Sequence, residues 1–139
     1  MMNRILIDTM HLMKLFKDDS YLELAGAISD GEIEAISSVL SLAELTKKLG
    51  VIDEKRMRAT LQELLASRLV FINVTSTIAM RAGDLRLRYD IPTVDSMIAA
   101  TGIIENTRHV FTGDIHHFKP IRNIIKIIDL ETAIKMSRR

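Results

Sequence analysis

The sequence predicts an α/β fold, a three-layer α/β/α sandwich around a parallel five-stranded sheet. Short apolar runs rich in β-branched residues alternate with segments whose apolar residues recur every three or four positions. Helical segments between consecutive strands require crossover connections, which give parallel pairing with helices on both faces of the sheet. Of the 139 residues, 47% are apolar and 27% are charged, as in a globular chain with a sizeable core. We therefore expect a single domain over residues 1–139, since this length leaves no room for a second complete core.

The first half of the chain is expected to hold three strands. Residues 4–8 are a short apolar run that ends in Asp8, which is typical of a buried strand. Asp30 and Gly31 end a helical segment, and the alternating residues that follow suit a second strand. Gly50 is expected to end a helix that opens at Ser41, and Asp53 to cap the next helix. The expected elements are strand 4–8, helices 9–17 and 20–29, strand 32–37, helices 41–49 and 53–69, and strand 71–74.

The second half is expected to hold two more strands. Thr75 or Ser76 caps a helix that runs to Tyr89, and Pro92 separates it from the next helix. The remaining elements are helix 93–106, strand 109–112, strand 124–128 and a closing helix over 131–137. The predicted order of strands and helices is therefore βααβααβααββα.

Composition excludes several classes of function. The chain has no Cys, which excludes disulfide scaffolds, thiolate metal sites and Cys nucleophiles. Aromatic residues make up 4% of the chain, too few for a nucleic-acid surface built on stacked rings. No apolar run approaches the ~18 residues of a membrane span, and Asp8 interrupts the first run too early for a secretory signal. We expect a cytoplasmic protein that does not contact a membrane.

Four acidic residues fall where a parallel sheet places its ligands. Asp8 ends the first strand, and Asp114 lies two residues beyond the fourth. Asp95 and Glu44 lie in the first turns of the helices before the fourth strand and after the second. Such sheets bind ligands outside the carboxyl ends of their strands, where the strand order reverses, so all four carboxylates converge if strands one and four are neighbours. Hard oxygen donors suit Mg²⁺ or Mn²⁺, which can activate water for phosphodiester hydrolysis.

Each acidic residue also has a purely structural interpretation. Asp8 can cap the helix that follows it, and Asp114 can be a turn residue. Ser41 and Glu44 match a capping box, in which the Glu side chain bonds back to the Ser backbone. Asp95 can simply favour the dipole of its helix.

One pattern favours a functional role for Asp95. Asp95, Ala99 and Gly102 share one face of their helix, and the small residues allow this face to approach the sheet closely. A close approach buries Asp95, which is costly for a carboxylate without a partner.

Other polar residues receive weaker assignments. We interpret His116 and His117 as surface imidazoles beside a turn, although they lie close enough to Asp114 to touch a substrate. Arg81, Asp84 and Arg88 have the spacing of a salt-bridged helix face. Four further cations are candidates to flank the acidic edge and hold phosphates: Arg86, Arg108, Lys119 and Arg122.

Four segments of the chain resemble the PIN domain family, and more narrowly the VapC-type toxins of prokaryotic toxin–antitoxin pairs. The resemblance extends from Arg4 to about Leu130. The segments are Ile5-Leu6-Ile7-Asp8-Thr9, Ser41-Leu42-Ala43-Glu44-Leu45, Val94-Asp95-Ser96-Met97-Ile98-Ala99-Ala100-Thr101, and Phe111-Thr112-Gly113-Asp114 with Phe118.

The resemblance implies a sheet of order 3-2-1-4-5 and a Mg²⁺- or Mn²⁺-dependent endoribonuclease. It also implies RNA as the substrate, a cognate antitoxin as the inhibitor, and a homodimer. The implied acidic quartet, which is both catalytic and metal-binding, is Asp8, Glu44, Asp95 and Asp114. Thr112 would contact these acids without itself binding the metal. Family members often carry another acidic residue or Asn after the last Asp, where this chain has Ile115, His116 and His117, so one or two metal ions are possible.

Two other functions are alternatives to a ribonuclease. The chain can be a catalytically silent PIN-like module that binds RNA or serves as a scaffold, although such a module does not need all four acids. A phosphatase with an Asp nucleophile would need a second Asp two residues after Asp8, where this chain has Met10.

Overall fold

The computed structural model describes residues 3–138 and contains a five-stranded parallel sheet with the strand order β3-β2-β1-β4-β5. The predicted fold class and strand order are therefore confirmed. Leu6 at the centre of the sheet opposes Ile36 on one side and Val110 on the other. The strands are β1 (Arg4–Ile7), β2 (Glu34–Ser38), β3 (Val70–Ile72), β4 (His109–Phe111) and β5 (Lys126–Ile128).

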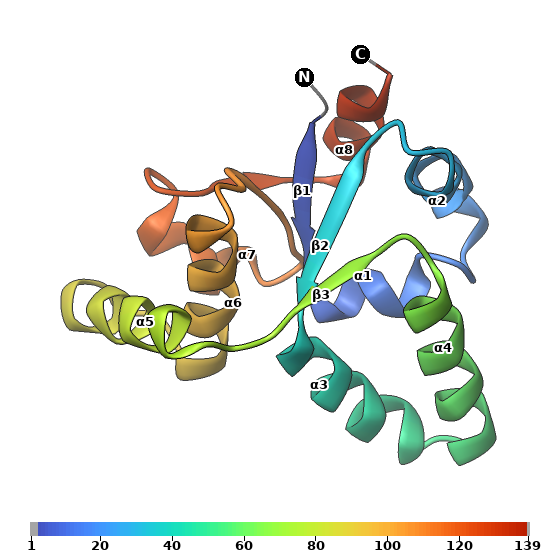
Figure 1. The fold of residues 1–139 in the computed structure, drawn as a ribbon, viewed down its shortest axis with the longest axis horizontal. Coiled ribbons are helices and arrows are strands. Elements are labelled where there is room, and N and C mark those ends of the chain that lie inside the picture. Colours follow the sequence, from blue (N-terminus) through green and yellow to red (C-terminus); the bar gives the residue numbers. More distant parts are fainter. Residues whose placement is uncertain (1–2, 139) are drawn as a thin grey trace.

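Helices cover both faces of the sheet (Figure 1). One face carries α1 (Thr9–Lys14), α2 (Leu22–Ser29), α3 (Val39–Gly50), α4 (Glu54–Ala66) and α8 (Leu130–Ser137). The other carries α5 (Ser76–Arg88), α6 (Thr93–Ile104) and the single turn α7 (Ile115–Phe118). Short 3₁₀ turns occupy Asp19–Tyr21 and Lys119–Ile121.

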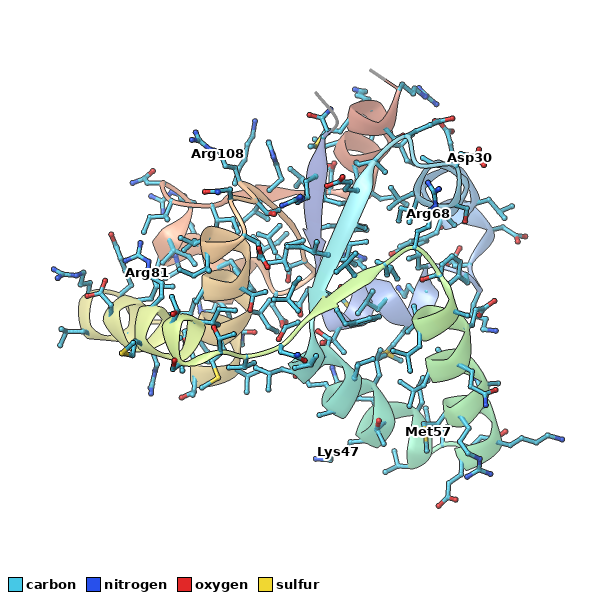
Figure 2. The ribbon with its side chains drawn as sticks, viewed as in Figure 1. Asp30, Lys47, Met57, Arg68, Arg81 and Arg108 are labelled. Atoms are coloured by element: carbon cyan, nitrogen blue, oxygen red, sulfur yellow. The ribbon has the colours of Figure 1, made fainter. Side chains whose placement is uncertain are left out.

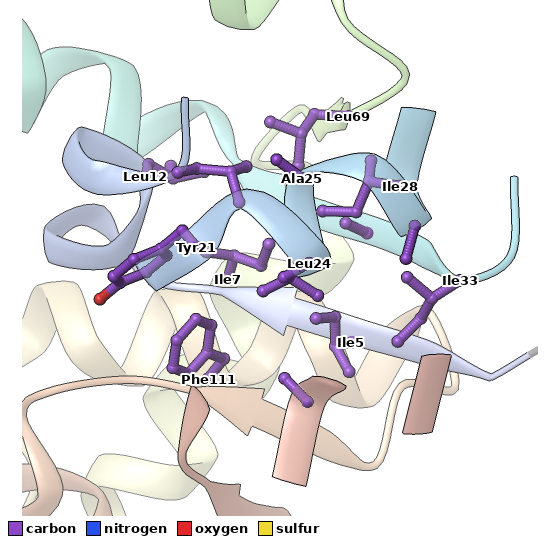
Figure 3. Close-up of a cluster of buried hydrophobic side chains, with 14 of the residues drawn as sticks. Ile5, Ile7, Leu12, Tyr21, Leu24, Ala25, Ile28, Ile33, Leu69 and Phe111 are labelled. Atoms are coloured by element: carbon purple, nitrogen blue, oxygen red, sulfur yellow. The ribbon is translucent and has the colours of Figure 1, made fainter. Parts of the chain in front are cut away.

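The alternation of side chains along each strand divides the core into two halves. In β1, Ile5 and Ile7 pack under the α1, α2 and α8 layer, whereas Leu6 packs against the α6 side. Figure 3 shows the first half, in which Ile5, Ile7 and Phe111 of the sheet meet Leu24 of α2. All of these side chains are at most 1% exposed, so the central strands are fixed from both sides.

The predicted close approach of α6 to the sheet is observed. A Cβ atom built on Gly102 would lie 3.1 Å from Leu6 Cδ2 and 3.1 Å from Ile125 Cδ1, which leaves little room for any larger residue. Ala99 is fully buried and Asp95 is 8% exposed. The small face of α6 thus holds an acidic side chain against the sheet.

The beginning of α3 differs from the prediction. The helix starts at Val39, and its cap is Ser38, the last residue of β2, whose hydroxyl accepts a hydrogen bond from the N–H of Leu40. Ser41 therefore lies inside the helix, and the capping-box interpretation of Ser41 and Glu44 is wrong. Gly50 is the last residue of the helix rather than the residue after it.

The turn α7 was not predicted from the sequence. A single turn is too short for apolar periodicity, but Phe118 at its end is fully buried and anchors it. The other differences are shifts of element ends. For example, the strand predicted over 124–128 begins at Lys126, because the N–H groups of Ile124 and Ile125 both bond to the carbonyl of Ile121 in a turn.

Within residues 3–138, no helix has the length and apolar character needed to cross a lipid bilayer.

Candidate metal centre

The carboxyl ends of β1 and β4 meet at the centre of the sheet. Asp8 directly follows β1, and its N–H donates to the carbonyl of Phe111, the last residue of β4, at 3.0 Å. The strand order changes direction here, because the chain extends from β1 to β2 on one side and returns to β4 on the other. Residues that follow these two strands are therefore neighbours, as the sequence analysis required.

Thr112 links the two acidic residues that follow these strands. One carboxylate oxygen of Asp8 accepts from the N–H of Thr9 at 2.7 Å, and the other accepts from the Thr112 hydroxyl at 2.7 Å. The same hydroxyl accepts from the N–H of Asp114 at 3.0 Å. Thr112 is 3% exposed, so its orientation is protected from competition by water. It fixes the Asp8 side chain and the backbone of Asp114 relative to each other.

Glu44 reaches the same edge of the sheet from α3. Its Oε1 accepts from the Thr9 hydroxyl at 2.5 Å, and that hydroxyl also lies 2.9 Å from Ser41 Oγ. Thr9 therefore stands between Glu44 and the end of β1. No role of its own was predicted for Thr9, although it ends the first of the four segments that resemble the PIN domain.

Asp95 lies in the first turn of α6 and faces the other acids. Burial, together with the negative charges of Asp8 and then Asp114, raises the pKa of Asp95 from 3.8 to about 6, although His117 opposes the shift. The shift indicates that negative charge accumulates here beyond what the protein neutralises. A carboxylate in this position gains from a bound cation.

His117 joins this group from α7. Its Nδ1 lies 2.8 Å from Asp95 Oδ2, and its side chain is 45% exposed. Asp95, Asp114 and His117 each offer a possible metal-ligand atom, and these atoms lie within 4.8 Å of one another. The interpretation of His117 as a surface imidazole is therefore correct about its exposure but missed its contact with Asp95. The missing signal was the turn α7, which brings a residue three positions after Asp114 back toward the sheet.

His11 is a second imidazole near the site that the sequence analysis did not single out. Its ring stacks on Phe111 with 3.6 Å between ring centroids, and its Nδ1 lies 2.8 Å from the Tyr21 hydroxyl. Burial is the largest effect on this ring and lowers the pKa of His11. The lowered pKa favours the neutral form of the ring, which packs on Phe111.

The cations proposed to flank the acids are not all at this edge. Arg108 directly precedes β4 and so lies at the amino end of the strands, opposite to the acidic residues (Figure 2). Its suggested role in holding phosphates at the acidic edge is therefore wrong. Arg86 donates through Nε to the carbonyl of Ile91 at 3.2 Å, which ties α5 to the loop that leads into α6. Asp84 bonds both Arg81 and Arg88, at 2.9 and 3.1 Å, as the helical spacing predicted.

The donor set suits a divalent cation. Asp95 and Asp114 each offer a carboxylate oxygen to the same small region, and Asp8 is close enough for its charge to act on Asp95. Within residues 3–138 no Lys or Arg forms an ion pair with any of the three. Oxygen-rich sites of this kind select hard or borderline divalent ions.

The chain is therefore a parallel α/β/α sandwich whose acidic residues gather at the switch point between β1 and β4, where open α/β sheets bind their ligands. The sequence model of the PIN domain matches residues 5–122. The chain belongs to the PIN domain family.

Solved structures share this fold. A chain of VapBC2 from Rickettsia felis, bound to a DNA fragment from its promoter, has a TM-score of 0.74 at 23% identity, over 91% of this chain and 98% of that one. A chain of DNA-bound VapBC from Salmonella typhimurium has a TM-score of 0.73 at 20% identity, over 93% of this chain and 99% of that one. VapC20 from Mycobacterium tuberculosis, a toxin that cleaves the sarcin-ricin loop, has a TM-score of 0.60 at 18% identity, over 81% of this chain and 92% of that one. No curated protein matches the sequence.

Proposed function

We propose that the chain is a metal-dependent endoribonuclease that hydrolyses RNA phosphodiester bonds and acts as the toxin of a toxin–antitoxin pair. The observation that carries this proposal is the gathering of Asp8, Asp95 and Asp114 at the junction of β1 and β4, where burial and then the charges of Asp8 and Asp114 raise the pKa of Asp95 to about 6. Membership of the PIN domain family and the fold shared with VapC20 support RNA as the substrate.

Asp8, Asp95 and Asp114 would hold the ion, Mg²⁺ or Mn²⁺. When bound, a divalent ion at such a site neutralises charge on the scissile phosphate and lowers the pKa of a water molecule. Thr112 keeps Asp8 in one orientation through its 2.7 Å hydrogen bond, so that an oxygen of Asp8 does not have to be reorganised on binding.

Glu44 would act on the attacking water. The Thr9 hydroxyl holds one Glu44 oxygen at 2.5 Å, which fixes the carboxylate while its other lone pairs can accept a proton. Because water rather than the ribose 2′-hydroxyl attacks, we expect products with 5′-phosphate and 3′-hydroxyl ends. A 2′,3′-cyclic phosphate product would contradict this role.

The proposed setting is cytoplasmic, with an antitoxin protein as partner and a homodimer as the assembly. The shared fold with chains of VapBC complexes supports the antitoxin partner. The segment over residues 10–16 offers little surface for a dimer interface, because Leu12 and Leu15 are each 1% exposed, although Met10 is 40% exposed. Core packing therefore accounts for most of its apolar residues. Light scattering of the purified chain tests the homodimer, and a monomer would contradict it.

The first test is cleavage of a total-RNA substrate by the purified protein with MgCl₂, MnCl₂ or EDTA, alongside Asp95→Asn. The matched control is Asp30→Asn, which removes an exposed acid near the amino end of β2, far from the site (Figure 2). We expect metal-dependent cleavage that is lost in Asp95→Asn and kept in Asp30→Asn.

Cleavage that persists in excess EDTA, or that Asp95→Asn retains in full, would contradict the proposed mechanism. No cleavage by a folded sample with either metal would favour the catalytically silent RNA-binding or scaffold module.

A further inference from the structure

We infer that His117 is a nitrogen ligand of the metal site and that it shifts the site's preference away from Mg²⁺ toward Mn²⁺ and later first-row transition ions. The inference rests on the metal site of the proposed function. It adds an imidazole to the carboxylates of Asp8, Asp95 and Asp114 that the proposed function already assigns to the metal.

The turn α7 places the His117 ring at the acidic site. The N–H groups of His117 and Phe118 both donate to the carbonyl of Asp114, at 3.0 and 3.2 Å, so the turn folds back directly after the last acidic residue. Phe118 is fully buried in the core half that contains α6, which fixes the turn against the helix that carries Asp95. The position of His117 is therefore set by packing as well as by its own contact with Asp95.

The ring nitrogen already lies among the oxygens that would bind a cation. Nδ1 of His117 is 2.8 Å from Asp95 Oδ2, and one ligand atom each from Asp95, Asp114 and His117 lie within 4.8 Å of one another. Two carboxylates and one imidazole are a mixed nitrogen and oxygen donor set, which differs from a purely acidic cluster. A divalent ion that binds the carboxylates would displace the proton that Nδ1 donates to Asp95, and the ring nitrogen would then be a ligand on the same side.

Asp95 is the ion-pair partner of His117 among the residues that the structure describes. The His116 ring lies 6.0 Å from the His117 ring between centroids, and among the described ion pairs of residues 3–138 the imidazole of His117 contacts Asp95 alone. With 45% of its side chain exposed, the ring is not confined by burial and is free to rotate onto an ion.

A nitrogen ligand changes which ion the site prefers. Mg²⁺ requires oxygen ligands in near-ideal octahedral geometry, whereas imidazole is a good ligand for transition ions. Affinity for a site with nitrogen donors rises from Mn²⁺ toward Ni²⁺ and Cu²⁺ in the general order for divalent ions. Replacing the imidazole by a carboxylate should therefore restore Mg²⁺ binding relative to Mn²⁺.

The test compares the full chain with His117→Asp and His117→Asn, and uses His116→Gln as the matched control on the same turn. The EPR signal of free Mn²⁺ measures Mn²⁺ affinity, and competition with MgCl₂ measures Mg²⁺ affinity. Pulsed EPR of the bound Mn²⁺ reports whether a nitrogen is directly coordinated. Circular dichroism confirms that each variant is folded.

We expect nitrogen coupling in the natural chain and in His116→Gln, and its loss in both His117 variants. The ratio of Mn²⁺ to Mg²⁺ affinity should fall by about tenfold in His117→Asp, a change of the size found when groups around a metal ligand are altered. Both results would support the inference.

Bound Mn²⁺ without nitrogen coupling, together with an unchanged affinity ratio in His117→Asp, would overturn the inference and leave the proposed ribonuclease intact. Failure of the natural chain to bind either ion would overturn the metal site of the proposed function and the role of His117 with it.

Discussion

At the scale of single residues, the site depends on a buried hydroxyl as much as on its acids. Thr112 donates to Asp8 and accepts from the backbone of Asp114, so one small side chain connects the ends of two strands. Removing it leaves Asp8 buried with one oxygen unpaired, which is costly in a region of low dielectric constant.

Thr112→Val, which keeps the shape but removes the hydroxyl, should lower the free energy of unfolding by about 1–3 kcal/mol. It should also weaken Mn²⁺ binding by about 10-fold or more, because Asp8 loses the group that orients it. Urea denaturation and Mn²⁺ titration measure the two effects. Thr112→Ser keeps the hydroxyl and should bind Mn²⁺ nearly as the natural chain does, and equal weakening in both variants would disprove the role of the hydrogen bond.

Asp95 makes the metal-free protein less stable at neutral pH. Its pKa is raised from 3.8 to about 6, so the native state binds more protons than the unfolded state between these pH values. Stability therefore falls as the pH rises through this range and changes no further through Asp95 above it.

Asp95→Asn removes this effect and should raise the free energy of unfolding at pH 7, on the order of 1 kcal/mol, in the absence of metal. The gain should disappear near pH 4. Urea denaturation with EDTA at both pH values measures it. A variant less stable than the natural chain at pH 7 would show that Asp95 is instead a stabilising structural residue.

At the scale of elements, the contact between α6 and the sheet places Asp95 at the site. Gly102 and Ala99 leave room for the helix to approach Leu6, so the acidic end of α6 is carried toward the ends of β1 and β4. The spacing of these small residues allowed this contact to be predicted from the sequence.

Gly102→Val should destabilise the fold by about 1–3 kcal/mol, since added atoms would overlap Leu6 and Ile125 in a close-packed core. The matched control is Gly83→Ala in the neighbouring helix α5, where an added Cβ meets no atom within 4 Å. The free energy of unfolding of that control should rise by about 0.5–1 kcal/mol, because Gly is unfavourable inside a helix. Thermal unfolding of both variants distinguishes them, and an equally stable Gly102→Val would show that α6 can move away from the sheet.

The elements that sequence reasoning located are those with many residues in a repeating pattern. The central strands and the long helices have continuous apolar runs or stripes, and their order along the chain is correct apart from α7. Local chemistry was harder to predict. Ser38 and Ser41 are both good capping residues, and only the length of β2 decides that Ser38 caps α3. The contact of His117 with Asp95 depends on α7, whose one buried anchor, Phe118, makes no periodic pattern.

At the scale of the whole molecule, the repulsion among the acids should make folding stability respond to metal. An ion that binds only the native state stabilises it in proportion to the logarithm of its concentration over its dissociation constant. The effect requires the assembled sheet, because Asp8, Asp95 and Asp114 come together through the pairing of β1 with β4.

MnCl₂ at about 100 times its dissociation constant should raise the melting temperature of the natural chain by about 5–10 °C. Asp95→Asn should show little change under the same conditions, although it is the more stable protein without metal. Differential scanning calorimetry measures both, and an equal rise in the two proteins would place metal binding elsewhere on the chain.

The hydrogen bond from Thr112 to Asp8 joins residues 104 positions apart in the chain. During synthesis β1 is made long before β4, so this edge of the sheet cannot form until β4 has been made. A chain cut short before Thr112 lacks Asp114 and the hydroxyl that orients Asp8. The proposed metal site is therefore complete only after the chain has been made through Asp114, so the proposed activity cannot begin on a nascent chain that ends before this residue.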